Sequence, residues 1–280
     1  MTKPEHSSEP STNILTISID RYDNKYIGTK DGWVKKISPE GDVLWQFMNS
    51  IGRVYAIAVD NDNYVYSGGW DGVVTKRSPE GIEVWSFTGH KETVFSVAVD
   101  ACGHVYSGSA DGTVRKLFTD GQEAWRFKGH CGMVTVVVSD TDGNVYSGGQ
   151  DRTIRKISPE GNEIWCFTGH TSWIHAVAVD SQGNVYSGSW DGVLRKTSPK
   201  GEEIWRFTDY KEPIFAVALD THGNIYCGGN DDTIRKLSPE GNEICKFTVY
   251  SNNIFALATD SKGNVHGESR NDLIKITSKD

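Results

Sequence analysis

Short apolar runs recur along the chain with a period of forty residues. In the unit that begins at Lys91 they cover residues 94–99, 104–108, 113–117 and 124–127. The runs are rich in Val, Ile, Tyr, Phe and Trp, which suit a pleated, half-buried surface. None shows a sustained helical stripe or approaches the length of a helix. The pattern therefore predicts four short strands in every unit.

Turn residues separate these runs at equally regular places. Residues 100–103, Asp-Ala-Cys-Gly, supply an aspartate for an Asx turn and a glycine that can adopt positive φ. Asp111-Gly112 is a strong signal for a two-residue hairpin. In the next unit, residues 158–161, Ser-Pro-Glu-Gly, close a further hairpin. The four strands of a unit are therefore predicted to be antiparallel neighbours in one sheet.

The repeat accounts for the whole length of the chain. Ten leading residues, six units of 40 and a final 30 residues make 280. The units start near residues 11, 51, 91, 131, 171, 211 and 251. A fixed period of this length indicates a repeat architecture, and four-stranded units stacked radially form a β-propeller with few open sheet edges. We predict an all-β fold with seven blades.

The two ends of the chain depart from the repeat. The final unit stops after its third predicted strand, 273–277, so the last blade lacks a fourth strand of its own. Residues 1–13 occupy the register of that missing strand, yet they carry neither apolar alternation nor a tryptophan. We predict a polar leader over 1–13 and a single propeller domain over 14–280. Whether the leader completes the seventh blade stays open.

Several units carry a Gly-His pair, then an apolar strand, then a run such as Ser-Gly-Ser-x-Asp-Gly-Thr-Val-Arg. This spacing resembles the WD-repeat family of β-propellers. The resemblance implies a hydrogen-bonded network that joins the loop histidine to the hairpin aspartate and a strand serine. The pairs that match are His90 with Asp111, His130 with Asp151, and His170 with Asp191. The Trp-Asp that ends the third strand in that family is absent here, where Leu117-Phe118 stands in one unit.

A second resemblance covers the other half of the unit. The run Val-Asp-x-x-Gly-Asn-Val-Tyr-x-Gly-Ser-x-Asp-Gly, ending in Gly-x-x-x-Trp, is similar to the blades of pyrroloquinoline-quinone-type propellers. Members of that group that are enzymes often place an adjacent pair of cysteines against the cofactor, and this chain has no Cys-Cys. Both resemblances imply a propeller, and neither specifies an activity.

Composition narrows the function classes. With 37% apolar residues, 280 residues can bury a substantial core in one domain. A net charge of −8 argues against a general nucleic-acid binder. The leader has no apolar segment typical of a signal peptide, and no run of 18 apolar residues exists, so we expect neither secretion nor a membrane partner. Five cysteines, odd in number and without a pattern, indicate a reducing compartment. We predict a cytoplasmic monomer.

Repeated side chains at fixed slots are interpreted as scaffold. One tryptophan per unit predicts the same packing between blades each time rather than a ligand box. These residues are Trp45, Trp85, Trp125, Trp165 and Trp205. Arg-Lys pairs recur too, and we expect Lys116 to lie opposite Glu123 in a cross-strand ion pair, not in a phosphate site.

Chemical motifs are otherwise weak. Residues 140–144 resemble the start of a calcium loop but lack its later glutamate. His170 and His175 have no zinc-ligand neighbours in sequence, and no Gly-x-Ser-x-Gly motif is present. We therefore predict no catalytic residues, no cofactor and no metal, and a protein that is not an enzyme.

Two slots vary between units while the scaffold slots barely change. One follows the Gly-His position and the other precedes the hairpin aspartate, and both are expected at the mouth of the central channel. The varied face gathers Trp, Tyr and Arg, the residue types that dominate binding hot spots. The candidates for partner binding are Trp70, Trp173, Trp190, Tyr210, Tyr250, Arg53, Arg152 and Arg270. Relaxed drift on exposed loops is the competing explanation.

These observations favour a non-catalytic interaction platform that binds a protein or peptide partner, as the WD-repeat resemblance also implies. One alternative is a carbohydrate-binding propeller in which Trp70, Trp173 and Trp190 stack on sugars. A remote alternative is a quinone- or metal-dependent oxidoreductase. One contiguous patch would favour the protein partner, and separated sites would favour the lectin.

Overall fold

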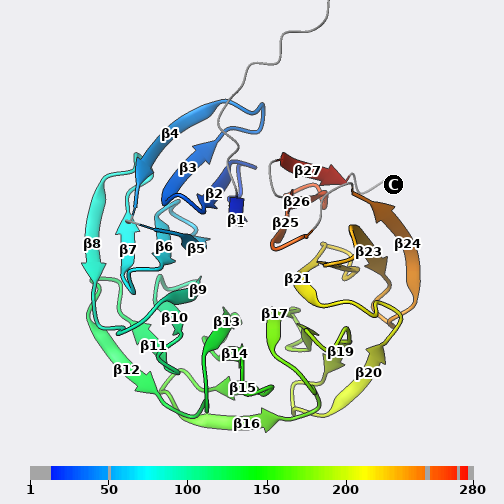
Figure 1. Cartoon of the computed structure of the whole chain (residues 1–280). Coiled ribbons are helices and arrows are strands. Elements are labelled where there is room, and N and C mark those ends of the chain that lie inside the picture. Colours follow the sequence, from blue (N-terminus) through cyan, green and yellow to red (C-terminus); the bar gives the residue numbers. More distant parts are fainter. Residues whose placement is uncertain (1–13, 50–51, 250–252, 270–271, 277–280) are drawn as a thin grey trace, which may run out of the picture.

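The computed structural model describes residues 14–49, 52–249, 253–269 and 272–276. Its strands form separate antiparallel sheets that stand around a central opening like the blades of a propeller (Figure 1). Six sheets have four strands, and the last has three within the described residues. The predicted seven-bladed, all-β fold is confirmed, and within the described residues the final blade has three strands, as predicted.

The strands follow the forty-residue repeat closely. The first three blades comprise β1 (Ile14–Ile19), β2 (Lys25–Thr29), β3 (Trp33–Ile37), β4 (Val43–Met48); β5 (Val54–Val59), β6 (Val65–Gly69), β7 (Val74–Arg77), β8 (Glu83–Phe87); and β9 (Val94–Val99), β10 (Val105–Ser109), β11 (Val114–Leu117), β12 (Glu123–Phe127). The fourth and fifth comprise β13 (Val134–Ser139), β14 (Val145–Gly149), β15 (Ile154–Ile157), β16 (Glu163–Phe167); and β17 (Ile174–Val179), β18 (Val185–Ser189), β19 (Leu194–Thr197), β20 (Glu203–Phe207).

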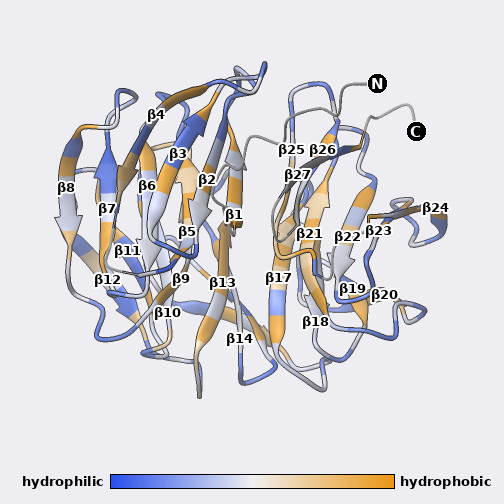
Figure 2. Ribbon diagram, turned by 45° about the horizontal axis from the view of Figure 1, so that its top comes forward, coloured by the Kyte–Doolittle hydropathy of each residue, from blue (hydrophilic) through white to orange (hydrophobic). Residues whose placement is uncertain are grey.

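The sixth blade comprises β21 (Ile214–Leu219), β22 (Ile225–Gly229), β23 (Thr233–Leu237) and β24 (Glu243–Thr248). The seventh comprises β25 (Leu257–Thr259), β26 (Val265–Ser269) and β27 (Asp272–Ile276). In each blade the first strand borders the channel, and in the four-stranded blades the fourth lies at the rim (Figure 1). Hydrophobic residues run along the strands, whereas the connecting loops are mostly hydrophilic (Figure 2).

The hydrophobic core lies between blades rather than within them. One buried cluster joins Tyr146 and Ile154 of the fourth blade to Ile174 and Val185 of the fifth. The second strand of a blade carries the repeated Val-Tyr-Ser-Gly, and β18 is buried along its whole length. Its glycine allows close approach, because a Cβ on Gly188 would lie 2.5 Å from Ile214 Cγ2 in the next blade. Each blade is therefore completed by its neighbour.

The repeated tryptophans connect neighbouring blades at the rim. Trp125 Nε1 donates a hydrogen bond to the Pro159 carbonyl of the next blade at 2.9 Å. Its ring packs on Gly161, where an added Cβ would lie 2.9 Å from the indole. The same indole-to-carbonyl bond is made by Trp45, Trp85, Trp165 and Trp205. These contacts explain why one tryptophan recurs per unit without invoking a ligand.

The predicted pairing of Lys116 with Glu123 is wrong. A β-bulge between Lys116 and Leu117 brings Leu117 opposite Glu123, and Arg115, two residues back on the same face, reaches the glutamate instead. Arg115 Nη1 lies 2.6 Å from Glu123 Oε2. Lys116 points to the other face, where its Nζ donates to the Pro159 carbonyl at 3.2 Å. The arginine, not the lysine, carries the cross-strand ion pair.

The ring closes where the last blade meets the first. Ile14, Ile17 and Ile27 form a buried cluster against Ala256 and Ala258. Asp23 accepts hydrogen bonds from the backbone N and the Oγ of Ser261 at 2.9 and 3.1 Å. The leader and its role in the seventh blade lie outside the described residues. Within the described part of the chain, no helix is long and apolar enough to cross a membrane.

Candidate interaction face at the channel mouth

The two varied loops of a blade lie side by side. In the fifth blade the backbone N of Trp190, in the hairpin between β18 and β19, donates to the Trp173 carbonyl at 2.9 Å. The second blade repeats this bond from Trp70 to Arg53 at 2.9 Å. Further blades repeat it from Ala110, Gln150 and Asn230. The varied positions therefore share one face, at the end of the propeller where β17 begins.

Aromatic rings form a contiguous group on this face. Trp173 and Trp190 lie 5.6 Å apart between ring centroids, and Trp190 lies 5.9 Å from Phe215. Phe215 stacks on Phe255 at 5.3 Å. Trp190 is 47% exposed and Phe255 40% exposed. We call Trp173, His175, Trp190, Phe215 and Phe255 the aromatic patch, and it spans three successive blades.

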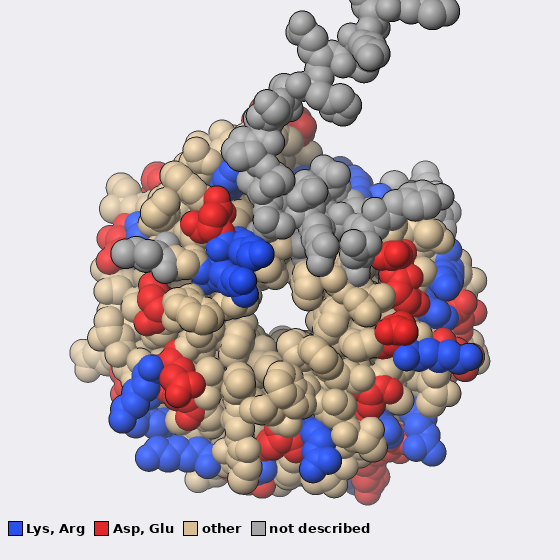
Figure 3. Space-filling model, viewed as in Figure 1, with Lys and Arg blue, Asp and Glu red and all other residues tan. Residues whose placement is uncertain are grey.

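A second group lies on the second and third blades. Tyr55 and Phe95 have ring centroids 5.2 Å apart, and Arg53 Nη1 donates to the Tyr55 hydroxyl at 3.2 Å. Trp70 is 60% exposed and covers Gly52. A view down the axis shows mostly uncharged side chains around the opening, apart from one group of Lys or Arg that reaches its edge, with many other charged residues nearer the rim (Figure 3). Strand residues such as Tyr55 and Phe95 therefore add aromatic rings at the channel mouth to those contributed by the loops.

Sequence reasoning missed the residues that belong to strands. Tyr55, Phe95, His175 and Phe215 are each the second residue of the strand next to the channel, and Phe255 occupies the same slot of the last unit. The signal was present as an aromatic side chain recurring at one slot. The variation between units is greatest in the loops, so a comparison of variable positions does not single out this slot.

Tyr210 is a wrong candidate for partner binding. Its side chain is 2% exposed, and its hydroxyl donates to the Thr233 carbonyl at 2.9 Å. It stands forty residues after His170, in the slot that points into the blade, so it replaces the buried histidine. Arg53 and Arg152 are exposed, and Arg152 sits in the β14–β15 hairpin with φ of 67°. Tyr250 and Arg270 lie outside the described residues.

The histidines of the Gly-His pairs are structural. His130 Nδ1 lies 3.0 Å from Asp151 Oδ2, and its Nε2 lies 2.8 Å from Ser147 Oγ. The same two contacts join His90 to Asp111 and Ser107, and His170 to Asp191 and Ser187. Burial raises the pKa of Asp191, but the hydrogen bond from His170 and others outweigh this and hold it at about 2. Each network fixes the entry loop of its blade.

His175 is the titratable member of the aromatic patch. Its ring lies 5.8 Å from Trp190 and 5.7 Å from Phe215, and its buried Nε2 has no hydrogen-bond partner. Burial lowers the pKa of His175 to about 4. An unfolded histidine binds its proton near pH 6.5. The stability that comes from keeping this ring neutral is therefore complete above about pH 6.5 and is lost as the pH falls toward 4.

We expect the wild-type protein to lose about 1–2 kcal/mol of stability between pH 7 and pH 5 through His175. The variant His175→Phe should lack this part of the loss, because phenylalanine fills the same slot at Phe95 and Phe215. Urea unfolding followed by circular dichroism at several pH values measures it. Equal slopes in both proteins would assign the pH dependence to other groups.

The fold is a WD40-like seven-bladed β-propeller. The structure of the WD40 beta propeller domain of Doa1 superposes with a TM-score of 0.85 at 21% sequence identity, covering 96% of this chain and 93% of that one. At this identity the likeness shows the fold alone.

Two family models match separate parts of the repeat. Residues 162–279 match the model described as lambda-carrageenase beta-propeller domain. Residues 30–149 match the model described as outer membrane protein assembly factor BamB. No curated protein matches the chain. The likeness is thus to propeller blades from proteins of different kinds.

Proposed function

We propose that the protein is a non-catalytic interaction platform that binds a protein or peptide partner at the channel mouth. The observation that carries the proposal is the contiguity of the aromatic patch over three blades. Large, partly exposed tryptophans that pack on one another resemble the anchor residues at the centre of protein interfaces. The WD40-like fold supports this, because such propellers commonly serve as interaction platforms.

The absence of a catalytic step is part of the proposal. The histidine–aspartate pairs, which could otherwise serve acid–base chemistry, are used in buried scaffold hydrogen bonds such as that of His130 with Asp151. We also propose that the protein is a monomer and that it is cytoplasmic, the latter on the basis of its unpatterned cysteines.

Replacing Trp173 and Trp190 together by alanine should weaken partner binding at least about tenfold, because tryptophan anchors contribute about 2 kcal/mol or more. The partner is first captured on immobilised wild-type protein from lysate of the source cells, then purified and titrated by calorimetry. A matched control replaces Ile204 and Ile244 by alanine, since both are exposed apolar residues on rim strands. Equal losses in the two variants, or none in the tryptophan variant, would contradict the proposal.

Trp70 favours a second candidate, a carbohydrate. It is more exposed than the tryptophans of the aromatic patch, and a lone indole face is suited to stacking on a sugar ring. The variant Trp70→Ala separates the two cases. Loss of binding to a glycan array in this variant alone would support the lectin, whereas loss of the protein partner only with Trp173 and Trp190 changed would support the platform.

A further inference from the structure

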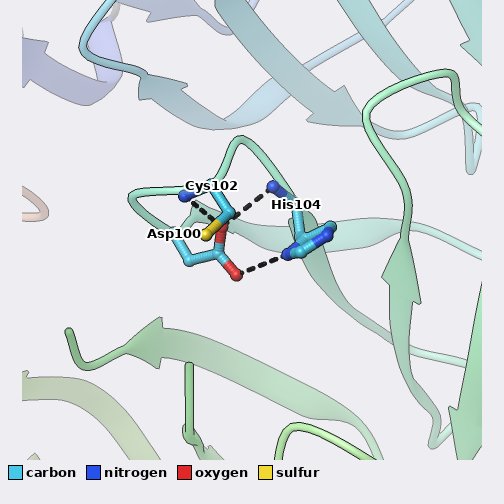
Figure 4. A group of neighbouring side chains, drawn as sticks. All are labelled: Asp100, Cys102 and His104. Carbon is cyan, nitrogen blue, oxygen red and sulfur yellow. Dashed lines mark hydrogen bonds and ion pairs between the residues drawn. The ribbon is translucent and has the colours of Figure 1, made fainter. Parts of the chain in front are cut away.

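The turn between β9 and β10 differs chemically from its counterparts in the other blades. It contains Asp100, Cys102 and His104, whose side chains converge (Figure 4). One donor atom from each, a carboxylate oxygen, the Sγ and a ring nitrogen, lie within 4.8 Å of one another. We propose that these three residues bind a divalent transition-metal ion, Zn²⁺ in the first place, at the end of the propeller opposite the aromatic patch.

The backbone of the turn already holds the donor groups together. Asp100 Oδ1 accepts hydrogen bonds from the backbone N of Cys102 and of His104, each at 2.9 Å. Asp100 Oδ2 lies 2.9 Å from His104 Nδ1 and accepts a hydrogen bond from the Tyr106 hydroxyl at 2.8 Å. The hydrogen bond from Tyr106 thus fixes the orientation of the Asp100 carboxylate, as hydrogen-bond partners of metal ligands do in metal sites. All three side chains come from the one short turn between Val99 and Val105.

The donor set suits a borderline metal ion. Zn²⁺ binds cysteine sulfur at about 2.3 Å and histidine nitrogen or carboxylate oxygen at about 2.0–2.2 Å. Donor atoms at these distances from one ion lie closer together than 4.8 Å, so the three side chains must draw slightly closer when the ion binds. Calcium and magnesium, which prefer oxygen ligands, are disfavoured by the sulfur and nitrogen. Three protein ligands leave a position for water or for a donor from a partner.

Comparison between blades shows that the fold does not require the histidine. In the next blade Asn144 occupies its slot, and its Nδ2 donates to Asp140 Oδ2 at 2.8 Å. Asn184 and Asn224 make the same bond in their blades. An asparagine therefore makes the side-chain hydrogen bond to the aspartate that the turn needs. His104 makes the same bond through Nδ1, and its Nε2 is not needed by the turn.

A neighbouring hairpin departs from the repeat at the same spot. Phe118 and Thr119 replace the Ser-Pro found at 158–159 and in four other units. The ring of Phe118 meets the ring of His104 edge-on at 5.9 Å, so it restricts how the imidazole can turn. Three residues that differ from the repeat, His104, Phe118 and Thr119, therefore lie close to this turn, although they are apart in sequence.

The surroundings favour the approach of a cation. Cys102 is exposed, so an ion can reach its sulfur from solvent. A pocket of about 140 Å³ beside it is lined by Cys102, by Asp60 and Asp62 of the preceding blade, and by Lys76. The two carboxylates outnumber the single lysine, whose Nζ lies 4.4 Å from the centroid of the Tyr64 ring, so the charged lining next to Cys102 remains negative and favours cations.

The test is a titration of the reduced full-length protein with Co²⁺, followed by absorbance of the thiolate-to-cobalt band, with Zn²⁺ competition against a chromophoric chelator. Wild type should bind one ion per chain. His104→Asn installs the residue of the next blade and should fold normally, yet affinity should fall at least about tenfold. Cys102→Ser should abolish the charge-transfer band.

Two matched controls exclude other thiols. Cys131→Ser and Cys166→Ser remove exposed cysteines elsewhere on the propeller, and both should bind Co²⁺ as wild type does. The proposal is overturned if wild type binds no ion at tenth-millimolar concentration, if His104→Asn binds as tightly as wild type, or if a control variant loses the site. Circular dichroism of every variant verifies that the propeller is intact.

Discussion

Replacing His130 by alanine is expected to destabilise the propeller by about 3 kcal/mol, because it leaves a buried carboxylate and a buried hydroxyl short of their partner. The imidazole is fully buried and lies 3.0 Å from Asp151 Oδ2, whose own side chain is 8% exposed. Its other nitrogen meets Ser147 Oγ at 2.8 Å. Urea unfolding followed by circular dichroism measures the loss.

The acid limb of the stability profile gives an independent readout. Burial raises the pKa of Asp151, but hydrogen bonds from His130, Cys131 N and Thr153 outweigh this and hold it well below its usual range. Such a group contributes stability above about pH 4, and the contribution is lost as the pH falls further. Without His130 the pKa of Asp151 rises, so the loss of stability between about pH 4 and pH 2 should be shallower in the variant.

The chain supplies a matched control for this experiment. In the sixth blade Tyr210 and Cys227 stand in the slots of His130 and Ser147, and the tyrosine hydroxyl bonds to a backbone carbonyl instead. The double variant His130→Tyr, Ser147→Cys copies that arrangement and should lose less stability than His130→Ala. If alanine costs under 1 kcal/mol, or if the double variant is the less stable of the two, the network does not stabilise the blade as described.

The fold was predictable because the same pattern of strands and turns repeats in every unit of the sequence. A forty-residue period fixed the blades, and glycine and aspartate at recurring slots marked the turns. The register of strand pairing was harder to predict from the sequence. The alternation of residue types does not reveal the bulge at Lys116. Because of this bulge, Arg115 and not Lys116 forms the ion pair with Glu123. Local propensity specifies strands, whereas a bulge depends on how two strands twist against each other.

The candidate site was predictable only in part. Loop variation correctly located Trp173 and Trp190 on one face, because both loops adjoin the start of the first strand. It could not reveal that Phe215 and Phe255 extend the group, since their neighbours come from other blades. The spacing of the five cysteines likewise gave no sign that the Cys102 sulfur lies within 4.8 Å of donor atoms of Asp100 and His104, because only the folded turn brings them together. Contacts between blades, such as that of Phe215 with Phe255, arise only when the ring is folded.

Replacing Gly188 by valine is expected to cost about 3 kcal/mol or more, through overpacking between blades. A Cβ at this position would lie 2.5 Å from Cγ2 and 3.1 Å from Cβ of Ile214, which is fully buried on the first strand of the next blade. Valine gains at most about 1 kcal/mol from its higher strand propensity, so the clash decides the sign. Gly188→Ala should be milder, at about 1–3 kcal/mol, because it adds only the Cβ.

A double-mutant cycle shows whether this contact is the cause. Ile214→Ala alone should cost about 2–5 kcal/mol, because it opens a cavity beside Gly188. Combined with Gly188→Ala it should cost less than the sum of the two single changes, by about 1 kcal/mol or more, since the added methyl occupies part of that space. Strict additivity would mean that the glycine is needed for backbone reasons within β18 instead. Favourable coupling would show that glycine is needed at position 188 because Ile214 of the next blade approaches it so closely.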